Sequence, residues 1–594
     1  MEQQTTCNDM NQCSLERQIT ASGDAISQIK IILAAFHDDE QKTVLGCLDN
    51  CYRKGSFNFL STISHLPDNE YSSDFAFQLI EIFRNYIDIC SHQSVEEVFR
   101  AAEKCHRFAG KDLASGLALE PIETYLCRYP EDIDSAIMHC EHTNPYGNGS
   151  PFLWWAALRQ NVKANWGKFL SWMDNAQTDG EIVVAIHTLA FVPEKTGEVL
   201  WVAADVVDRI IKWHTRCHDD AGKGALYRAN EAWRKVVDRR HLPALEEIAR
   251  KLLNEGNPMV LHWAAQEASF SGKTQAAEEV DALLSAFSKI DPQHKGSVGH
   301  LSFYLRTVMG VYPEKVLSFM ETYCLDHSCT VTIFDGAIRA IANCDETLRN
   351  KYLTRWLASD SVFVARNVQE IASGVRPDKA LEIKAVFASS EEGTDDFLLL
   401  LFYRAIGWLY LLPETCVGFL ISCACQMRNI ECLKSTYSDF FYLVVVNYLD
   451  EYRQALNHIP ACKRHAPIYK YLRKLALDAE EWWKRLDAAG KVPELYPSIR
   501  HKELHAKRQA EIYGKVMEEA HEKSFLSQIA HDIRLLHGRG SITPVYTEGG
   551  ENLQESLLHR FNVSVRISRL TEIEGHTLEI RLRELRRARW EEET

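Results

Sequence analysis

Glycine and proline are both sparse in this chain of 594 residues, with 29 and 17 occurrences. A β-rich protein with many tight turns needs more of both, because glycine supplies positive φ angles and proline fixes turn geometry. Their scarcity therefore argues against an all-β fold and favours long helices. Apolar residues at 46% and charged residues at 25% are ordinary for a folded chain, which excludes wholesale disorder.

Long apolar runs and export signals are also missing. The segment from Met1 to Gly23 lacks the apolar core of a secretory signal peptide, and the 17 cysteines are scattered, so we expect reduced thiols and a cytoplasmic protein. The longest apolar stretch, Phe397 to Cys425, contains Arg404 and is interrupted at Pro413. A membrane-spanning helix needs about 20 uninterrupted apolar residues. The stretch therefore predicts a buried helical hairpin and no membrane span.

Positive charge is in deficit, since the formal net charge is −15. This excludes a globally basic nucleic-acid-binding protein and leaves room for local patches. Residues 451–474 and 560–590 are both locally basic and include aromatic side chains, a combination that suits phosphate contacts and base stacking. A solvated helix face is the competing explanation. The candidate nucleic-acid contacts in the C-terminal third are Arg453, Lys463, Arg464, Lys470, Arg473, Lys474, Arg581, Arg583, Arg586 and Arg587.

Helical periodicity dominates most of the chain. Between Leu242 and Phe287, for example, apolar residues recur at helical spacing, Gly256 ends one predicted helix and Asn257 caps the next. Asp345 and Asp360 occupy the same capping position before two later helices. The connections are only a few residues long, which makes neighbouring helices antiparallel and stacks successive pairs into a solenoid-like array.

One stretch of this array has a likeness to known repeats. The segment from Val311 to Gly374 resembles HEAT or armadillo-type repeats, and its run "SDSVFVARNVQEIASG" is similar to the second helix of such a unit, with Asp360 at the turn. The resemblance is at superfamily level and covers about residues 180 to 450. It implies binding rather than any particular activity.

The C-terminal residues change from helical periodicity to alternation. Short alternating runs occur within Ser541 to Gly550, Phe561 to Ile567 and Leu578 to Leu582, and they predict a small antiparallel β element. We therefore expect an all-α fold, an irregular helical-repeat array closed by this β element. The predicted organisation is an N-terminal helical unit at 1–148, the repeat array at 151–490, a linker and long amphipathic helix at 491–540, and the β element at 541–594.

A short charged motif suggests catalysis. The run "RHKELH", Arg500 to His505, resembles the R-[NDH]-x3-H signature of HEPN-type ribonucleases, which are all-helical. In that family the Arg and the His meet at a dimer interface, so Arg500 would stabilise phosphoryl charge and His505 would act in acid–base chemistry. The competing explanation is the charged first turn of a long helix.

Metal-binding patterns are weak. Four soft ligands are close in sequence, but paired Cys-x2-Cys knuckles are missing, so we expect neither a metal nor another cofactor. These ligands are Cys324, His327, Cys329 and Cys344.

Tryptophan is the one abundant unusual residue. Of the 13 tryptophans, many are concentrated between Trp154 and Trp233. Large aromatic residues in a helical array are most often core residues wedged between helices. A peptide-binding groove is the alternative explanation.

These observations favour a non-enzymatic helical-repeat scaffold or adaptor that binds a large protein partner. By analogy, it would be an accessory subunit of a bacterial antiviral defence complex. Two alternatives stay open: a HEPN-like ribonuclease that uses Arg500 and His505, and a nucleic-acid sensor that uses residues 451–474 and 560–590. The pattern leaves the oligomeric state undetermined.

Overall fold

A computed structural model describes most of the chain. Up to residue 488 it describes residues 14–488, with gaps at 39–40, 69–70, 111–112, 197–202, 272–274, 375–379, 388–393 and 461–465. Beyond that it describes 498–500, 503–504, 506–508, 510–511, 514–515, 540–547, 550–557, 568, 570–571 and 575–589.

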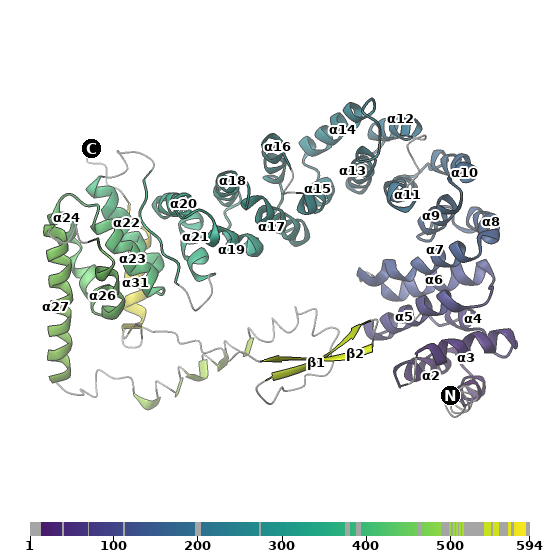
Figure 1. The fold of residues 1–594 in the computed structure, drawn as a ribbon, viewed down its shortest axis with the longest axis horizontal. Coiled ribbons are helices and arrows are strands. Elements are labelled where there is room, and N and C mark those ends of the chain that lie inside the picture. Colours follow the sequence, from purple (N-terminus) through teal and green to yellow (C-terminus); the bar gives the residue numbers. More distant parts are fainter. Residues whose placement is uncertain are drawn as a thin grey trace. The chain divides into compact units, whose positions relative to one another are not determined.

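The chain forms two compact units, Met1–Ala264 (unit 1) and Ala265–Thr594 (unit 2), and the helix α15 (Pro258–Ser271) contains the boundary. The described elements of unit 1 are helical (Figure 1). Its helices are α2 (Ala25–Asp38), α3 (Gln41–Arg53), α4 (Phe59–Ser64), α5 (Ser73–Ile89), α6 (Val95–Ala109), α7 (Glu120–Arg128), α8 (Ile133–Thr143), α9 (Ser150–Gln160), α10 (Val162–Asp174), α11 (Asp179–Thr196), α12 (Ala203–His214), α13 (Asp220–Arg234) and α14 (Leu242–Glu255).

Unit 2 continues the same architecture and adds a two-stranded hairpin. Its helices are α16 (Ala277–Phe287), α17 (Lys295–Met309), α18 (Pro313–Asp326), α19 (Asp335–Asn343), α20 (Glu346–Ala358), α21 (Val362–Ser373), α22 (Asp395–Leu409), α23 (Pro413–Ala424), α24 (Ile430–Ser435), α25 (Tyr437–Asp439), α26 (Leu449–Asn457), α27 (Pro467–Ala488) and α31 (Gly575–Arg586). Its strands are β1 (Gly540–Thr547) and β2 (Gly550–Leu557), which pair antiparallel.

Each unit stacks its helices in two layers. In unit 1, α7, α9, α11 and α13 are successive neighbours in one layer, while α8, α10, α12 and α14 pack against them. In unit 2, α17, α19 and α21 form one layer and α18 and α20 lie in the other. Helices of the first layer thus contact both a sequence neighbour and the next helix but one, which is the packing of a helical repeat. The expected helical array is confirmed at this level.

Local helix signals act as the sequence predicts at three of four positions. Gly256 ends α14 at φ 69°, a left-handed conformation that favours glycine. Asn257 accepts from the backbone N–H groups of Met259 and Val260 and so caps α15, and Asp345 caps α20 by accepting from Leu348.

The predicted cap Asp360 is wrong. Ser361 occupies the N-cap position of α21, and the Asp360 carboxylate instead accepts from the guanidinium of Arg404 at 2.9 Å. An arginine partner competes successfully with a backbone N–H because the hydrogen bond is charge-assisted at both ends.

The long apolar stretch folds as a helical hairpin. It forms α22 and α23, which pack together and bury most of their side chains. Among the described residues, the longest and most apolar helices fall short of what a membrane crossing requires.

The predicted C-terminal β element is not supported as a whole, although β1 overlaps the predicted run within Ser541 to Gly550. The run from Leu578 to Leu582 lies in the helix α31 instead of in a strand. Leu578, Leu582 and Leu585 are buried, whereas Ile580 is exposed, so the buried residues follow helical spacing and the alternation was fortuitous. The predicted strand at 561–567 and most of the predicted linker and long helix at 491–540 lie outside the described residues.

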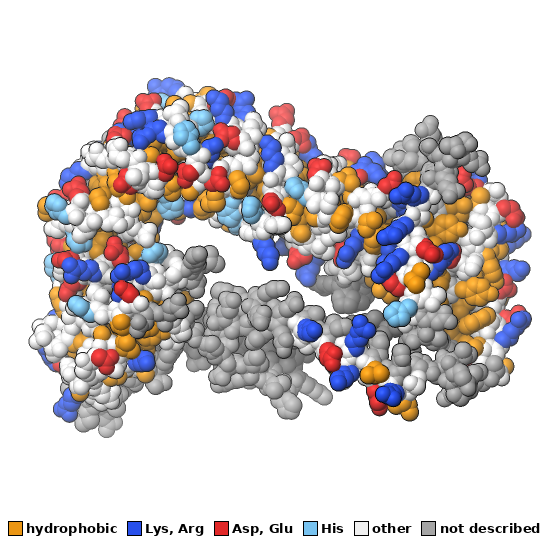
Figure 2. All heavy atoms as spheres, turned by 180° about the vertical axis from the view of Figure 1, so that it is seen from behind, with side chains coloured by type: hydrophobic (Ala, Val, Ile, Leu, Met, Phe, Trp, Pro, Cys, Tyr) orange, Lys and Arg blue, Asp and Glu red, His pale blue; other side chains and the backbone are white. Residues whose placement is uncertain are grey.

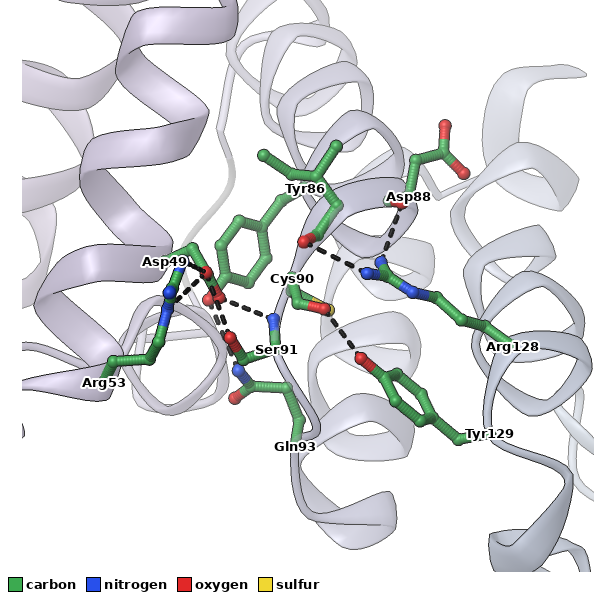
Figure 3. Close-up of polar contacts among 10 residues, drawn as sticks. Asp49, Arg53, Tyr86, Asp88, Cys90, Ser91, Gln93, Arg128 and Tyr129 are labelled. Atoms are coloured by element: carbon green, nitrogen blue, oxygen red, sulfur yellow. Dashed lines mark hydrogen bonds and ion pairs between the residues drawn. The ribbon is translucent and has the colours of Figure 1, made fainter.

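A buried polar network fixes the connection between α5 and α6 in unit 1 (Figure 3). Asp49 is 3% exposed and accepts from the backbone N–H and hydroxyl of Ser91 and from Arg53. Burial would raise the pKa of the Asp49 carboxyl, but the hydrogen bonds from Ser91 and Arg53 outweigh it and lower that pKa. Tyr129 donates to the Cys90 carbonyl at 2.9 Å. These partners satisfy the buried carboxylate, so the network has a structural role.

Candidate functional site

A half-buried stack of aromatic and cationic side chains crosses one helical layer of unit 1. We call it the aromatic ladder. Its residues come from α9, α11, α13 and the first part of α15, and all except the more deeply buried Trp155 are of intermediate exposure. They are Phe152, Trp155, His187, Phe191, Lys195, Arg228 and Trp263.

A proline inside α11 explains how the neighbouring helices are held to it. Pro193 lies inside α11 and has no backbone N–H, so the carbonyl four residues earlier, on Leu189, loses its helical donor. The indole of Trp233, from α13, donates to that carbonyl at 2.9 Å. The indole of Trp155, from α9, donates to the neighbouring Thr188 carbonyl, also at 2.9 Å. Two tryptophans thus tie the adjacent helices to α11.

The rings and cations then stack from helix to helix. Trp155 meets Phe191 edge-on, with ring centroids 5.1 Å apart. The guanidinium of Arg228 lies between two rings, at 4.0 Å from the centroid of Phe191 and 4.3 Å from that of Trp263. A cation between two aromatic faces gains about 0.5–2 kcal/mol from each ring. Arg228 therefore links α11, α13 and α15.

A glycine makes this spacing possible. A Cβ atom on Gly224 would lie 2.7 Å from the Cβ atom of Met259 and 3.3 Å from the ring of Trp263. A side chain at position 224 would force α13 and α15 apart. Gly224 thus lets the Trp263 ring reach Arg228.

The charged and titratable side chains of the ladder have different neighbours. Lys195 lies over the Trp155 ring and pairs with Glu123 of α7 at 2.8 Å. His187 lies 3.5 Å from a guanidinium nitrogen of Arg228. Burial, together with the positive charge of Arg228, lowers the pKa of His187 to about 4. His187 is therefore neutral at pH 7, and the positive charge resides on Arg228.

The predicted basic residues of 451–474 differ in their surroundings. Arg453 forms an ion pair with Glu480. Lys470, Arg473 and Lys474 are exposed on α27. Lys463 and Arg464 lie outside the described residues. Nucleic-acid binding by this segment stays a prediction.

Three of the predicted basic residues in 560–590 are paired with acids. Arg581 donates to the Asp439 carboxylate at 2.8 and 2.7 Å, and Arg583 pairs with Glu579. Arg586 also contacts Glu579, and its Nε donates to the Gly407 carbonyl. Of the four predicted contacts, Arg587 is exposed and has no carboxylate partner among the residues described.

The two residues of the predicted ribonuclease motif are only partly described. Arg500 is exposed, and His505 lies outside the described residues, so the ribonuclease hypothesis stays a prediction.

The cysteine cluster is dispersed. Cys324 is buried, the His327 ring contacts the Ser288 carbonyl at 2.7 Å, and the Cys344 thiol contacts the Asp345 carbonyl. Cys329 and Cys324 contact each other through their thiols. Within the described parts of the chain, His, Cys, Asp and Glu side chains form no group of three or more that could hold a metal ion.

Sequence reasoning missed the ladder as an assembly. Trp155 and Trp233 were predicted as core residues, and both are buried. The unrecognised signal was Pro193 inside a strongly helical segment, because it requires an outside donor for a specific carbonyl. Comparisons of the chain with protein-family profiles, curated proteins and solved structures gave no match.

Proposed function

We propose that this chain is a helical-repeat adaptor that binds a large protein partner through the aromatic ladder. The observation that supports the proposal most directly is Arg228 held between Phe191 and Trp263 on a half-buried face. Tryptophan and arginine dominate the energetics of protein interfaces, because they bury a large area with few rotatable bonds or combine stacking with hydrogen bonding.

The ladder suits a partner of a particular chemistry. Phe152, Phe191 and Trp263 are all of intermediate exposure, so part of each ring is accessible beside the stacked Arg228. A partner that offers flat apolar or aromatic side chains would extend the stack of rings that these residues form. A cytoplasmic location and a place in a defence complex, expected from the sequence, belong to the same proposal.

The test compares two arginine variants of unit 1. Arg228→Met keeps a flexible apolar side chain between the two rings, so the ladder remains packed while the positive charge is lost. Arg240→Met is the matched control, because Arg240 is 85% exposed and pairs only locally with Asp238. Tagged chains capture partners from nuclease-treated native lysate, and the affinity of the recovered protein is then measured for each purified chain.

We expect a stoichiometric protein that binds the wild-type chain and Arg240→Met equally, and binds Arg228→Met at least about tenfold more weakly, as for an interface hot spot. Equal binding to all three chains would show that the ladder is a structural feature only. Loss of capture after nuclease treatment would favour the nucleic-acid sensor instead.

A further inference from the structure

Unit 2 contains a second site that is chemically unlike the ladder. A cavity of about 370 Å³ opens between the turn that precedes α21, the helix α22 and the residues that follow α31. Four arginines line it, against one aspartate. They are Arg404, Arg586, Arg587 and Arg589. Figure 2 shows Lys and Arg side chains gathered on the visible face of this unit.

The most deeply buried charged side chain of the cavity is that of Arg404. Arg404 is 3% exposed, and its guanidinium donates to the backbone carbonyls of Ser359 and Ala588 at 2.7 and 2.9 Å, as well as to Asp360. Its orientation is thereby set by two separate segments, the turn at 359–360 and the residues that follow α31. The Asp360 side chain is 90% exposed, so water screens its charge and leaves Arg404 only partly neutralised.

The other wall is supplied by the C-terminal segment. α31 packs on α22 so closely that a Cβ atom on Gly407 would lie 2.6 Å from the backbone nitrogen of Arg586. Arg586 stacks on the Trp408 ring at 5.1 Å and is itself paired with Glu579. The cavity therefore exists only when α31 is docked.

The uncompensated charge is at the cavity mouth. Arg587 and Arg589 are both exposed, and no carboxylate of the described residues lies in ion-pair distance of either. Several guanidinium groups around one cavity repel one another, and a bound anion relieves that repulsion. The planar guanidinium forks also match the geometry of phosphate oxygens.

Two apolar side chains also belong to the lining. Val362 and Ala365, from the first turns of α21, line the cavity beside the arginines. A volume of about 370 Å³ lies within the range of small-molecule sites and exceeds what an inorganic anion fills. The ligand that fits therefore has an anionic end and an organic body.

We infer that this cavity binds a phosphorylated small molecule, a nucleoside phosphate in class, and that binding holds the C-terminal segment against α22. The phosphate contacts Arg587 and Arg589 and is attracted by the positive charge of Arg404. The organic part of the ligand contacts Val362 and Ala365. Because three of the four arginines belong to residues 586–589, ligand binding and docking of this segment are thermodynamically linked.

The test uses calorimetric titration of the full chain with ADP, adenosine, inorganic phosphate and a short single-stranded oligonucleotide. The double variant Arg587→Ala and Arg589→Ala removes the exposed charges without touching the core. Arg366→Ala is the control, because Arg366 is exposed on α21 and pairs only with Glu370. Trypsin cleavage after Arg587 and Arg589, with and without ADP, reports docking of the segment.

We expect ADP to bind the wild-type chain and the control equally, the double variant to bind at least about tenfold more weakly, and ADP to slow cleavage of the wild-type segment. Asp360→Asn removes the one anion of the lining and should tighten ADP binding about two- to fivefold. Gly407→Ala should undock α31 and abolish ADP binding, whereas Gly418→Ala should not, since a Cβ atom at Gly418 meets nothing within 4 Å.

Four results would overturn the inference. Adenosine binding as tightly as ADP would show that the arginines play no part. Phosphate binding as tightly as ADP would reduce the cavity to a non-specific anion site. Binding confined to the oligonucleotide would make this a nucleic-acid surface, and undetectable ADP binding at millimolar concentration would remove the site.

Discussion

Two arginines, Arg228 in unit 1 and Arg404 in unit 2, are both held among packed helices, but their surroundings handle the charge differently. Arg228 is stacked between two rings, whereas Arg404 is hydrogen-bonded to backbone carbonyls and one carboxylate. Stacking covers the faces of the guanidinium, and carbonyl bonds use its N–H groups. The first arrangement holds Arg228 by contacts with aromatic rings, and the second holds Arg404 by hydrogen bonds to the backbone.

The comparison predicts unequal effects of one substitution. Arg404→Met leaves the carbonyls of Leu357, Ser359 and Ala588 without their donor, so we expect unit 2 to lose about 3 kcal/mol of unfolding free energy. Arg228→Met exchanges two cation–aromatic contacts for two sulfur–aromatic contacts of similar strength, so it should cost unit 1 less than about 1 kcal/mol. Urea unfolding with hydrogen-exchange readout separates the two units.

Equal costs for the two substitutions would contradict this division. A structural role for Arg228 would appear as a loss comparable to that of Arg404→Met. Arg404→Lys is informative as well, because a lysine supplies the charge but lacks the planar fork that reaches several carbonyls, so it should restore little of the lost stability.

The ladder and the cavity should also differ in their response to acid. His187 has a pKa of about 4 in the folded state, below its ordinary value of 6.5, because it is buried and lies beside Arg228. The unfolded chain therefore takes up a proton near pH 6.5 that the folded chain refuses until about pH 4. Unit 1 should thus lose stability as the pH falls, by about 2 kcal/mol at pH 5 relative to pH 7.5.

The variant His187→Phe isolates this effect. It keeps an aromatic ring in the stack and has no proton to bind, so the pH-dependent loss in unit 1 should shrink by that amount. An unchanged pH dependence in His187→Phe between pH 7.5 and pH 5 would assign the acid sensitivity to other groups. Asp49 would not be one of them, because its lowered pKa makes stability fall only as the pH drops below the ordinary value of 3.8.

The sequence predicted features whose causes are local. Gly256, Asn257 and Asp345 act within one helical turn, and short-range patterns are enough to recognise them. The capping prediction for Asp360 was wrong because its partner, Arg404, is 44 residues away along the chain.

The site residues needed long-range information. Arg228 contacts side chains that are 37 residues before it and 35 residues after it, at Phe191 and Trp263. No short motif can contain such a set. The alternation at 578–582 misled the prediction for a related reason: its leucines fit both a strand and a helix, and only the packing of α31 on α22 selects the helix.

The smallest expected effect tests the origin of the ladder. Trp233→Phe removes the indole donor of the Leu189 carbonyl, which Pro193 has deprived of its helical partner. Pro193→Ala restores a backbone N–H at the position that can donate to Leu189. Trp233→Phe should therefore cost about 1 kcal/mol less in the Pro193→Ala background than in the wild-type chain, a coupling that a double-mutant cycle measures.

Trp155→Phe is the matched control for this cycle. Its indole donates to Thr188, whose helical donor is the backbone N–H of Val192, and that N–H is present with or without proline at 193. Coupling between Trp155→Phe and Pro193→Ala should be close to zero. Similar coupling for both tryptophans would mean that proline acts by bending α11 as a whole, whereas coupling confined to Trp233 would mean that one unpaired carbonyl determines where α13, and with it Arg228, is held.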